Sequence, residues 1–545
     1  MSVPDGSSRR PVSTFAPFEP RTPTAAECVV VLVLDRLAAE TPSKPFVVFD
    51  DGTEWTYAET LRRARRGAAA LRRLGVEPGQ FVLNWLPNGP AQLGLWLATN
   101  YLGAVHVPIA TSFRGGILRH VIANSGARLM VTHTGLAQRL ADIEPAGIET
   151  LIVLDGAGPS LSGTRILDRH ALEANDGLPA DFKPPHPWDI AAVIYTSGTT
   201  GLSKGVRVPY AQLWTLAQAQ LGYMTPEDRM LVTTPLAHIS PISGVMAALY
   251  RNASVAVLER FSTTDFWPQL RRTGSTAVPG LGPAIMEFLL KAPPRSDDRD
   301  NPLRIVNVRA PNPAVKAFAE RFGVDYFASF SMTETSCVTI SPINAALDNS
   351  CGQPRPGVDV RIVDAHDIEA PAGQLGEIVL RADHPWTLNA GYHNAPEATA
   401  QAWRNGWFHT GDAAWCDADG NFFFHDRLKD CIRRRGENIS SIEIEREVLA
   451  YPHVRDAAAI GVAGEFDDQE VLLVVSPRAG ASVDPRALIM FLIPRMPYFM
   501  VPRFVRVLPE LPKTMSDKVR KQEVLTMIDI VECWDRIGEG IVLKS

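Results

Sequence analysis

The chain has 545 residues, of which 46% are apolar and 21% charged, and its formal net charge is only −6. This length and composition are ordinary for a globular enzyme with several structural units, and the balance of acids and bases excludes the strong positive field of a protein that binds nucleic acid or an anionic membrane. The six cysteines are scattered without a C-x-x-C pair, which argues against a disulfide framework and a zinc site and favours a reducing compartment. Residues 1–23 are polar and proline-rich, and the early apolar run is far shorter than a membrane span, so we expect a soluble, cytoplasmic protein.

The first part of the chain alternates between helix and strand patterns. After a polar tail, apolar positions recur at helical spacing over residues 29–39 and again over 57–74. A hairpin is expected between these helices, around Asp51-Gly52. Short apolar strands separated by helical segments follow at residues 81–85, 103–108, 127–132 and 151–154. This alternation predicts a mainly parallel sheet covered by helices.

A loop rich in glycines and hydroxyls follows the apolar strand at residues 190–194. Residues 195–206 read Tyr-Thr-Ser-Gly-Thr-Thr-Gly-Leu-Ser-Lys-Gly-Val. The glycines let the backbone approach a ligand closely, and the hydroxyls and the Lys204 ammonium offer donors to a polyphosphate. The spacing is not that of the Walker loop, because Lys204 is followed by glycine rather than by Ser or Thr. The stretch therefore predicts a nucleotide-phosphate loop at the end of a buried strand.

The pattern changes near residues 426–429. A charged run at 433–438 precedes an acidic helix at 441–450, and a small module follows, with strands at 457–462 and 470–476 and a helix at 485–494. The expected fold is α/β: a large domain of residues 1–428, with helices packed on several sheets, and a small α+β domain of residues 429–545.

Several segments together resemble a known family. The loop at 195–206 is similar to the phosphate-loop signature of the adenylate-forming superfamily, which includes acyl-CoA synthetases, adenylation domains of peptide synthetases and beetle luciferases. Further matches follow in the family's order at residues 235–240, 330–335, 407–412, 426–430 and 511–521. Residues 305–335 and 532–536 resemble the crotonobetaine/carnitine-CoA ligase-like branch. The resemblance implies a large adenylation domain followed by a small mobile domain that carries a catalytic lysine.

The resemblance also implies an ATP site. In it, Asp412 accepts hydrogen bonds from the ribose hydroxyls, Phe330 stacks on adenine, and Glu334 with Thr200 binds Mg²⁺. Phe330 and Ser331 stand where the family usually has Tyr and Gly. The implied ATP- or AMP-binding residues are Thr196, Ser197, Gly198, Thr199, Thr200, Gly201, Phe330, Thr333, Asp412 and Arg427.

The implied acyl pocket contains one unusual residue. Arg309 stands where glycine is usual, so it either narrows the pocket, pairs with a polar group of the substrate, or points into solvent. The pocket residues that the resemblance implies are His238, Gly280, Arg309, Ala310 and Ala328.

The resemblance assigns the second half-reaction to the small domain. Gly436 and Arg435 would bind CoA, because a side chain at 436 would block the approach of pantetheine. The arginines at 433–435 either bind the phosphates of CoA or keep the loop soluble. Lys429 would be the hinge, and Lys518 would stabilise charge on the attacked phosphate. Asp517 stands where the family commonly has glycine.

The predicted function is an ATP-dependent, AMP-forming carboxylic acid:CoA ligase that uses ATP, Mg²⁺ and coenzyme A. Its expected partners are a small carboxylic acid and CoA, with no nucleic acid and no membrane span, and a homodimer is left open. Catalysis is assigned to Lys518, Glu334, His238 and Lys204. Two alternatives remain: a stand-alone adenylation enzyme that loads a carrier protein, and a non-catalytic homologue that binds nucleotide or acyl-adenylate. The sequence does not identify the acid.

Overall fold

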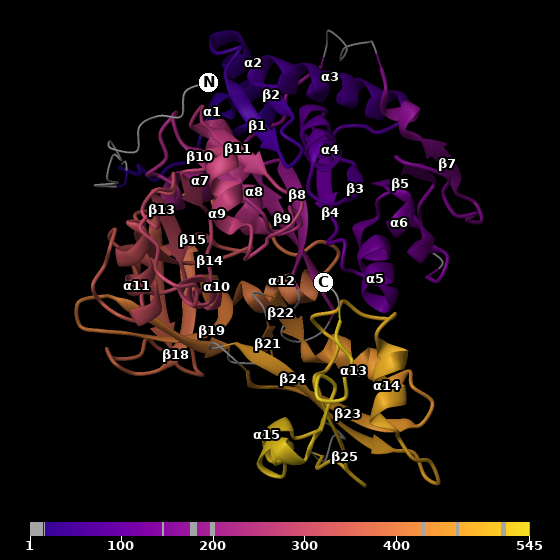
Figure 1. Ribbon diagram of the computed structural model, residues 1–545. Coiled ribbons are helices and arrows are strands. Elements are labelled where there is room, and N and C mark those ends of the chain that lie inside the picture. The colour runs from indigo at the N-terminus through magenta and orange to yellow at the C-terminus, as the bar shows by residue number, and fades with distance from the viewer. Residues whose placement is uncertain are drawn as a thin grey trace.

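The computed structural model describes residues 15, 17–143, 147–174, 182–196, 202–427, 431–434, 437–464, 468–513 and 519–543. Within these residues the chain forms a seven-stranded sheet, a thirteen-stranded sheet, a four-stranded sheet and a two-stranded hairpin. Figure 1 shows the N-terminal part in indigo and magenta above, and the last segment in yellow below.

The seven-stranded sheet has the order β7-β6-β5-β3-β4-β8-β9. All neighbouring strands are parallel except β8 and β9, which confirms the parallel sheet predicted from residues 81–154. Its strands are β3 (Phe81–Trp85), β4 (Val105–Pro108), β5 (Leu129–Thr132), β6 (Thr150–Val153), β7 (Arg165–Asp168), β8 (Ile190–Thr196) and β9 (Lys204–Pro209).

The thirteen-stranded sheet has the order β17-β18-β19-β20-β16-β15-β14-β13-β12-β10-β11-β1-β2. The strands from β1 to β14 are parallel, whereas those from β14 to β17 and the edge strand β2 are antiparallel. The strands are β1 (Pro45–Phe49), β2 (Glu54–Thr56), β10 (Arg229–Val232), β11 (Ser254–Val257), β12 (Ala277–Val278), β13 (Ile305–Val308), β14 (Asp325–Met332), β15 (Ser336–Ile340), β16 (Ser350–Pro354), β17 (Val358–Val363), β18 (Gly376–Ala382), β19 (Phe408–Cys416) and β20 (Phe422–Arg427).

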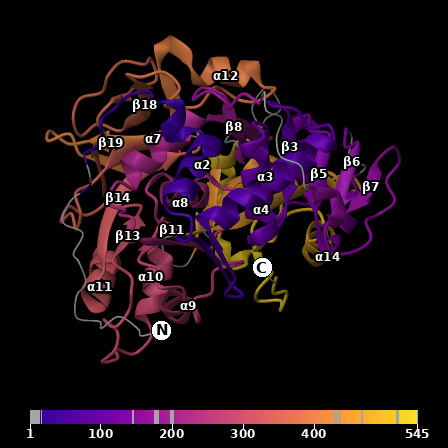
Figure 2. The same cartoon turned by 90° about the horizontal axis from the view of Figure 1, so that it is seen from above.

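Helices cover both faces of the parallel strands. Side chains of β3 alternate between two cores, because Val82 belongs to the central core and Leu83 to the core on the other face. The central core lies between the two large sheets and includes α2 (Val30–Glu40), α3 (Tyr57–Arg73), α4 (Pro90–Tyr101), α7 (Tyr210–Gln220) and α8 (Ile239–Tyr250). The outer faces are covered by α5 (Gly115–Ser125) and α6 (Thr134–Ala137) on one side, and by α9 (Phe266–Thr273), α10 (Pro283–Leu290) and α11 (Pro313–Phe322) on the other. This layering is visible from above in Figure 2.

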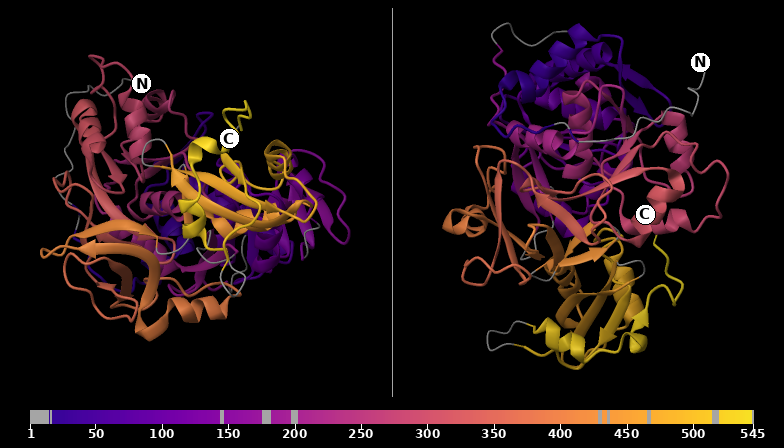
Figure 3. Two further views of the ribbon diagram at one scale, coloured as in Figure 1. Left: turned by 90° about the horizontal axis from the view of Figure 1, so that it is seen from below. Right: turned by 90° about the vertical axis from the view of Figure 1, so that its left-hand side faces the viewer.

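The last part of the chain packs around its own sheet. Alternate residues of its central strands face two cores: Ala457 and Ala459 join α13 and α14, whereas Ala458 and Ile460 join α15. The right-hand view of Figure 3 shows this part below the rest of the molecule. The elements are β21 (Cys431–Arg434), β22 (Glu437–Ser440), α13 (Ser441–Leu449), β23 (Val454–Ala463), β24 (Gln469–Pro477), α14 (Pro485–Leu492), β25 (Phe504–Val507), α15 (Lys521–Thr526) and β26 (Trp534–Asp535).

The strands and helices predicted between residues 441 and 494 are present. The charged run at 433–438, in contrast, was expected only as a segment before a helix, and its described residues belong to the paired strands β21 and β22. No helix in the described parts of the chain is both long and apolar enough to cross a membrane.

Candidate active site

The two strands that flank the predicted phosphate loop, β8 and β9, form an antiparallel hairpin on the edge of the seven-stranded sheet, which we call the phosphate hairpin. Thr196 ends β8 and Lys204 begins β9, and the two residues are Cα partners. Ser203, just before Lys204, is buried, and its carbonyl accepts a hydrogen bond from the ring of His120 (2.8 Å). Ser197, Gly198, Thr199, Thr200 and Gly201 lie outside the described residues.

A tyrosine that the sequence analysis missed joins two predicted catalytic residues. The Lys204 ammonium lies 5.1 Å from the centre of the Tyr392 ring, and the Tyr392 hydroxyl donates a hydrogen bond to Glu334 Oε1 (3.1 Å). Tyr392 comes close because its segment runs beside β9, where it forms a β-bridge with Val206. Lys204 and Glu334, which are far apart in the sequence, therefore meet at one place.

Glu334 is held just beyond the last parallel strand of the large sheet. The side-chain amide of Asn389 donates to the Glu334 carbonyl (2.8 Å), and that of Gln212 donates to the Thr333 carbonyl (2.8 Å). The Glu334 residue is only 6% exposed. A carboxylate anchored in this way fits Mg²⁺, which proteins commonly bind through one or two carboxylates together with phosphates of the substrate.

Arg309 and Phe330 share an aromatic neighbour. The Arg309 guanidinium lies 4.1 Å from the centre of the Phe424 ring, and that ring lies 6.0 Å from Phe330. The Arg309 side chain is exposed, and the stacking places its charge against Phe424, the neighbour of the ring expected to contact adenine. Of the other expected pocket residues, Ala310 follows Arg309 and Ala328 is buried in β14.

His238 occupies the position just before α8, and Gly280 faces the first turn of that helix. A Cβ atom at Gly280 would lie 3.5 Å from Ser240 Oγ. His238 Nε2 lies 3.4 Å from Glu437 Oε1 of β22. Burial lowers the pKa of His238, but the neighbouring Glu437 carboxylate outweighs this effect, so the pKa is raised. Burial likewise raises the pKa of Glu437, and His238 reverses that shift to a lowered pKa.

Asp412 lies in β19 and is 2% exposed. It is the Cα partner of Arg427 at the end of β20, so the backbone brings these two expected nucleotide contacts together. The other expected residues of the hinge, the CoA site and the catalytic loop, namely Lys429, Arg435, Gly436 and Lys518, lie outside the described residues.

Carboxylates of α13 contact the N-terminal part of the chain at two places. Glu443 Oε1 accepts hydrogen bonds from the backbone N–H (2.8 Å) and the hydroxyl (2.5 Å) of Ser203, beside the phosphate hairpin. Glu447 Oε1 accepts from the N–H of Gly116 in the first turn of α5 (3.2 Å), and Glu447 Oε2 pairs with Arg495 (2.9 Å). We call these contacts the α13 interface.

The described residues on either side of the expected catalytic lysine, Lys518, lie near the opposite face of the four-stranded sheet. These residues, Lys513 and Val519, form a β-bridge, and Val519 packs against the core that contains α15. The α13 interface lies on the other face, where Ile117 of α5 joins the core. Hence Val519 and the α13 interface lie on different faces of the four-stranded sheet.

Comparisons with known proteins agree with this fold. The sequence profile of the AMP-binding enzyme family matches residues 34–393, and that of the AMP-binding enzyme C-terminal domain matches residues 443–518. The structure superposes with a TM-score of 0.76 on the amide bond synthetase McbA from Marinactinospora thermotolerans. The two sequences are 26% identical, and the match covers 91% of this chain and 99% of McbA.

The curated relatives are named as CoA ligases. A sulfoacetate–CoA ligase of Cupriavidus necator is 31% identical over 92% of this chain and 98% of its own length. A crotonobetaine/carnitine–CoA ligase of Salmonella arizonae is 29% identical over 90% of this chain and 97% of its own. These matches confirm the predicted fold and the resemblance to acyl-CoA ligases, and the chain belongs to the AMP-binding enzyme family.

Proposed function

We propose that this protein is an ATP-dependent, AMP-forming carboxylic acid:CoA ligase. A carboxylate is a poor acyl donor, so it first attacks the α-phosphate of ATP, which forms an acyl-adenylate and releases pyrophosphate. The CoA thiol then attacks the acyl carbon, which forms a thioester and releases AMP. The observation that carries this proposal is the meeting of Lys204 and Glu334 through Tyr392 beside the phosphate hairpin.

In the first half-reaction, Lys204 and the loop from Thr196 to Gly201 hold the phosphates of ATP. Glu334, with Thr200, would bind Mg²⁺, which supplies positive charge to the phosphates. Phe330, Thr333, Asp412 and Arg427 position the nucleoside and α-phosphate, so that the attacking carboxylate and the phosphate are aligned. Lys518 would stabilise charge on the attacked phosphate.

The second half-reaction requires a different orientation of the C-terminal part. We propose a boundary at residues 428/429 with Lys429 as the hinge. In the orientation described, Glu437 contacts His238, which belongs to the proposed acyl pocket with Gly280, Arg309, Ala310 and Ala328. Gly436 and Arg435 precede Glu437 in the sequence, so this orientation suits delivery of CoA to the acyl carbon. Rotation would exchange this face for the one that carries Lys518.

Two assays test this function. Pyrophosphate release with a panel of carboxylic acids, measured without CoA, reports the first half-reaction and identifies the acid. AMP release on addition of free CoA reports the second. If none of the acids causes pyrophosphate release, the proposal is contradicted. AMP release that needs a phosphopantetheine carrier protein in place of free CoA would favour the carrier-loading alternative.

The proposal includes a cytoplasmic location, as the scattered cysteines suggest. A sizing experiment would determine whether two chains associate.

A further inference from the structure

Asp412 is presented by an irregularity between β18 and β19. Glu377 is the Cα partner of Ala413, and Val379 is the Cα partner of His409. Three residues of β19, Thr410, Gly411 and Asp412, therefore stand opposite the single residue Ile378. Such a bulge interrupts the ladder of hydrogen bonds and redirects a side chain. Gly411 has φ of +72°, as a sharp local turn requires.

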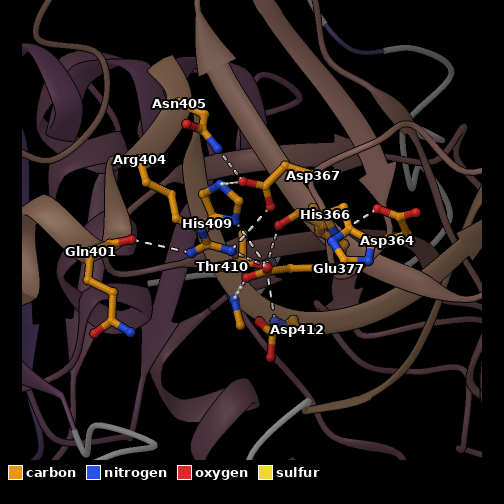
Figure 4. Close-up of polar contacts among 12 residues, drawn as sticks. Asp364, His366, Asp367, Glu377, Gln401, Arg404, Asn405, His409, Thr410 and Asp412 are labelled. Carbon is orange, nitrogen blue, oxygen red and sulfur yellow. Dashed lines mark hydrogen bonds and ion pairs between the residues drawn. The ribbon is translucent and has the colours of Figure 1, made fainter.

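The carboxylate of Glu377 satisfies backbone and side-chain donors of this bulge. Its Oε1 accepts a hydrogen bond from the Gly411 N–H (2.8 Å), and its Oε2 lies 3.0 Å from His409 Nδ1. Because a carboxylate only accepts, His409 donates from Nδ1. Figure 4 shows Glu377 close to His409, Thr410 and Asp412. One side chain on β18 thus contacts both the residue before the bulge and the middle residue of the bulge.

Further contacts hold Glu377 and the bulge. Arg404 donates to Glu377 Oε2 (3.2 Å) and to Asp367 (3.4 Å). Thr410 Oγ1 donates to the carbonyl of Ile378 (2.7 Å) and accepts from the Asp412 N–H (3.1 Å). All three bulge residues are therefore tied, directly or through a neighbour, to β18.

We propose that Glu377 is a positioning residue for the nucleotide ribose: it holds the bulge so that the Asp412 carboxylate faces the ribose hydroxyls. This inference rests on the proposed function, because that function assigns the ribose contact to Asp412. A residue that only stabilised the fold would affect every ligand of the site alike. A positioning residue affects recognition of the hydroxyls in particular.

The test measures binding of AMP and of 2′,3′-dideoxy-AMP to the full chain by calorimetry. Glu377→Ala removes both acceptors, Glu377→Gln retains an oxygen for the Gly411 N–H, and Asp412→Asn gives the effect of altering the ribose contact itself. The matched control is Glu369→Ala, because Glu369 lines the same small hollow as His409 and pairs with Arg361 (3.3 Å).

We expect Glu377→Ala to weaken AMP binding about tenfold and to leave the affinity for dideoxy-AMP nearly unchanged. Glu377→Gln should recover most of the loss, and Glu369→Ala should match wild type. An equal loss for both nucleotides, or wild-type AMP affinity in folded Glu377→Ala, would overturn the inference. If Glu377→Ala does not fold, Glu377→Met, which also removes both acceptors but keeps the length of the side chain, is tested against the same two outcomes.

The same data separate this inference from the proposed function. Wild-type protein that does not distinguish the two nucleotides, or Asp412→Asn that binds AMP like wild type, would contradict the ribose assignment, and the inference would fall with it. Normal discrimination in wild type, lost in Asp412→Asn but retained in Glu377→Ala, would overturn the role of Glu377 alone.

Discussion

The contacts of Glu377 with His409, Gly411 and Arg404, which we call the Glu377 cluster, use the same chemistry as the α13 interface in a different setting. In both, a carboxylate accepts a backbone N–H: Glu377 from Gly411, and Glu447 from Gly116. The first contact lies within one sheet, between strands that are also joined by their ladder. The second joins two parts of the chain that have largely separate cores. We therefore expect the Glu377 cluster to stay fixed through both half-reactions, whereas the α13 interface forms only for the second.

The largest effect is expected from Gly115→Ala. A Cβ atom at this position would lie 2.4 Å from the backbone carbonyl oxygen of Arg495, so the interface must shift. We expect the CoA-dependent step to slow at least about tenfold, while pyrophosphate release is unchanged. Single-turnover assays of the two steps provide the measurement.

The matched control for this variant is Gly126→Ala. Gly115 begins α5, and Gly126 follows its last residue. Gly126 also has positive φ (+66°), but nothing lies within 4 Å of the position that its Cβ would take. Equal slowing in both variants would show that backbone strain, rather than the interface, causes the effect.

A smaller effect, with a distinctive pH dependence, is expected from Glu443→Gln. Burial raises the pKa of Glu443 above its ordinary 4.5, although its bonds to Ser203 oppose the shift. The contribution of Glu443 to the stability of the described orientation of the C-terminal part is thus complete below the ordinary pKa. It is lost as the pH rises through the raised pKa. In wild type, the rate of the CoA-dependent step divided by the rate of pyrophosphate release should fall as the pH rises across this range.

A glutamine side chain can accept a hydrogen bond from Ser203 without burying a charge. Glu443→Gln should therefore remove this pH dependence and raise the ratio of the two rates a few-fold near neutrality. Glu445→Gln is the control, because Glu445 contacts Lys521 instead (2.7 Å). A wild-type profile in Glu443→Gln would contradict this role.

Arg404→Gln should reduce both half-reactions by the same factor, about two- to threefold. Arg404 is partly exposed and pairs with Glu377, so its contribution is modest. Arg361→Gln, beside the same hollow, is the control. Slowing confined to the CoA-dependent step would show that the cluster does not serve both steps alike.

The smallest effect concerns His238. Glu437→Gln should lower the pKa of His238, because Glu437 is the neighbour that raises it. The pair's contribution to docking is full between the ordinary pKa of Glu437, 4.5, and that of His238, 6.5. It is lost as the pH rises through the raised pKa of His238 or falls through the lowered pKa of Glu437. An NMR titration of the histidine ring measures the shift, and an unchanged pKa would show that the two residues do not meet in solution.

The sequence predicted the parts of the site that are local. The strand before Thr196, the parallel sheet and the order of the family segments were all visible in it. Tyr392 was missed because its place depends on long-range backbone pairing between its segment and β9, through a bridge to Val206 and the neighbouring hydrogen bonds. Glu377 was missed because its role depends on a bulge between β18 and β19. A bulge shifts the register of two strands, and the sequence of one chain carries no clear pattern that marks it. The contact between Glu437 and His238 depends on how the C-terminal part docks, which periodicity does not specify.

A cross-link tests most directly whether the orientation described serves thioester formation. The carboxylate of Glu447 lies where a Cβ of residue 116 would be, so thiols introduced by Gly116→Cys and Glu447→Cys would face each other. With these two thiols joined by a short cross-linker, we predict that the protein converts added acyl-adenylate and CoA to thioester but no longer releases pyrophosphate from ATP and the acid. Continued pyrophosphate release by the fully cross-linked protein would contradict the account.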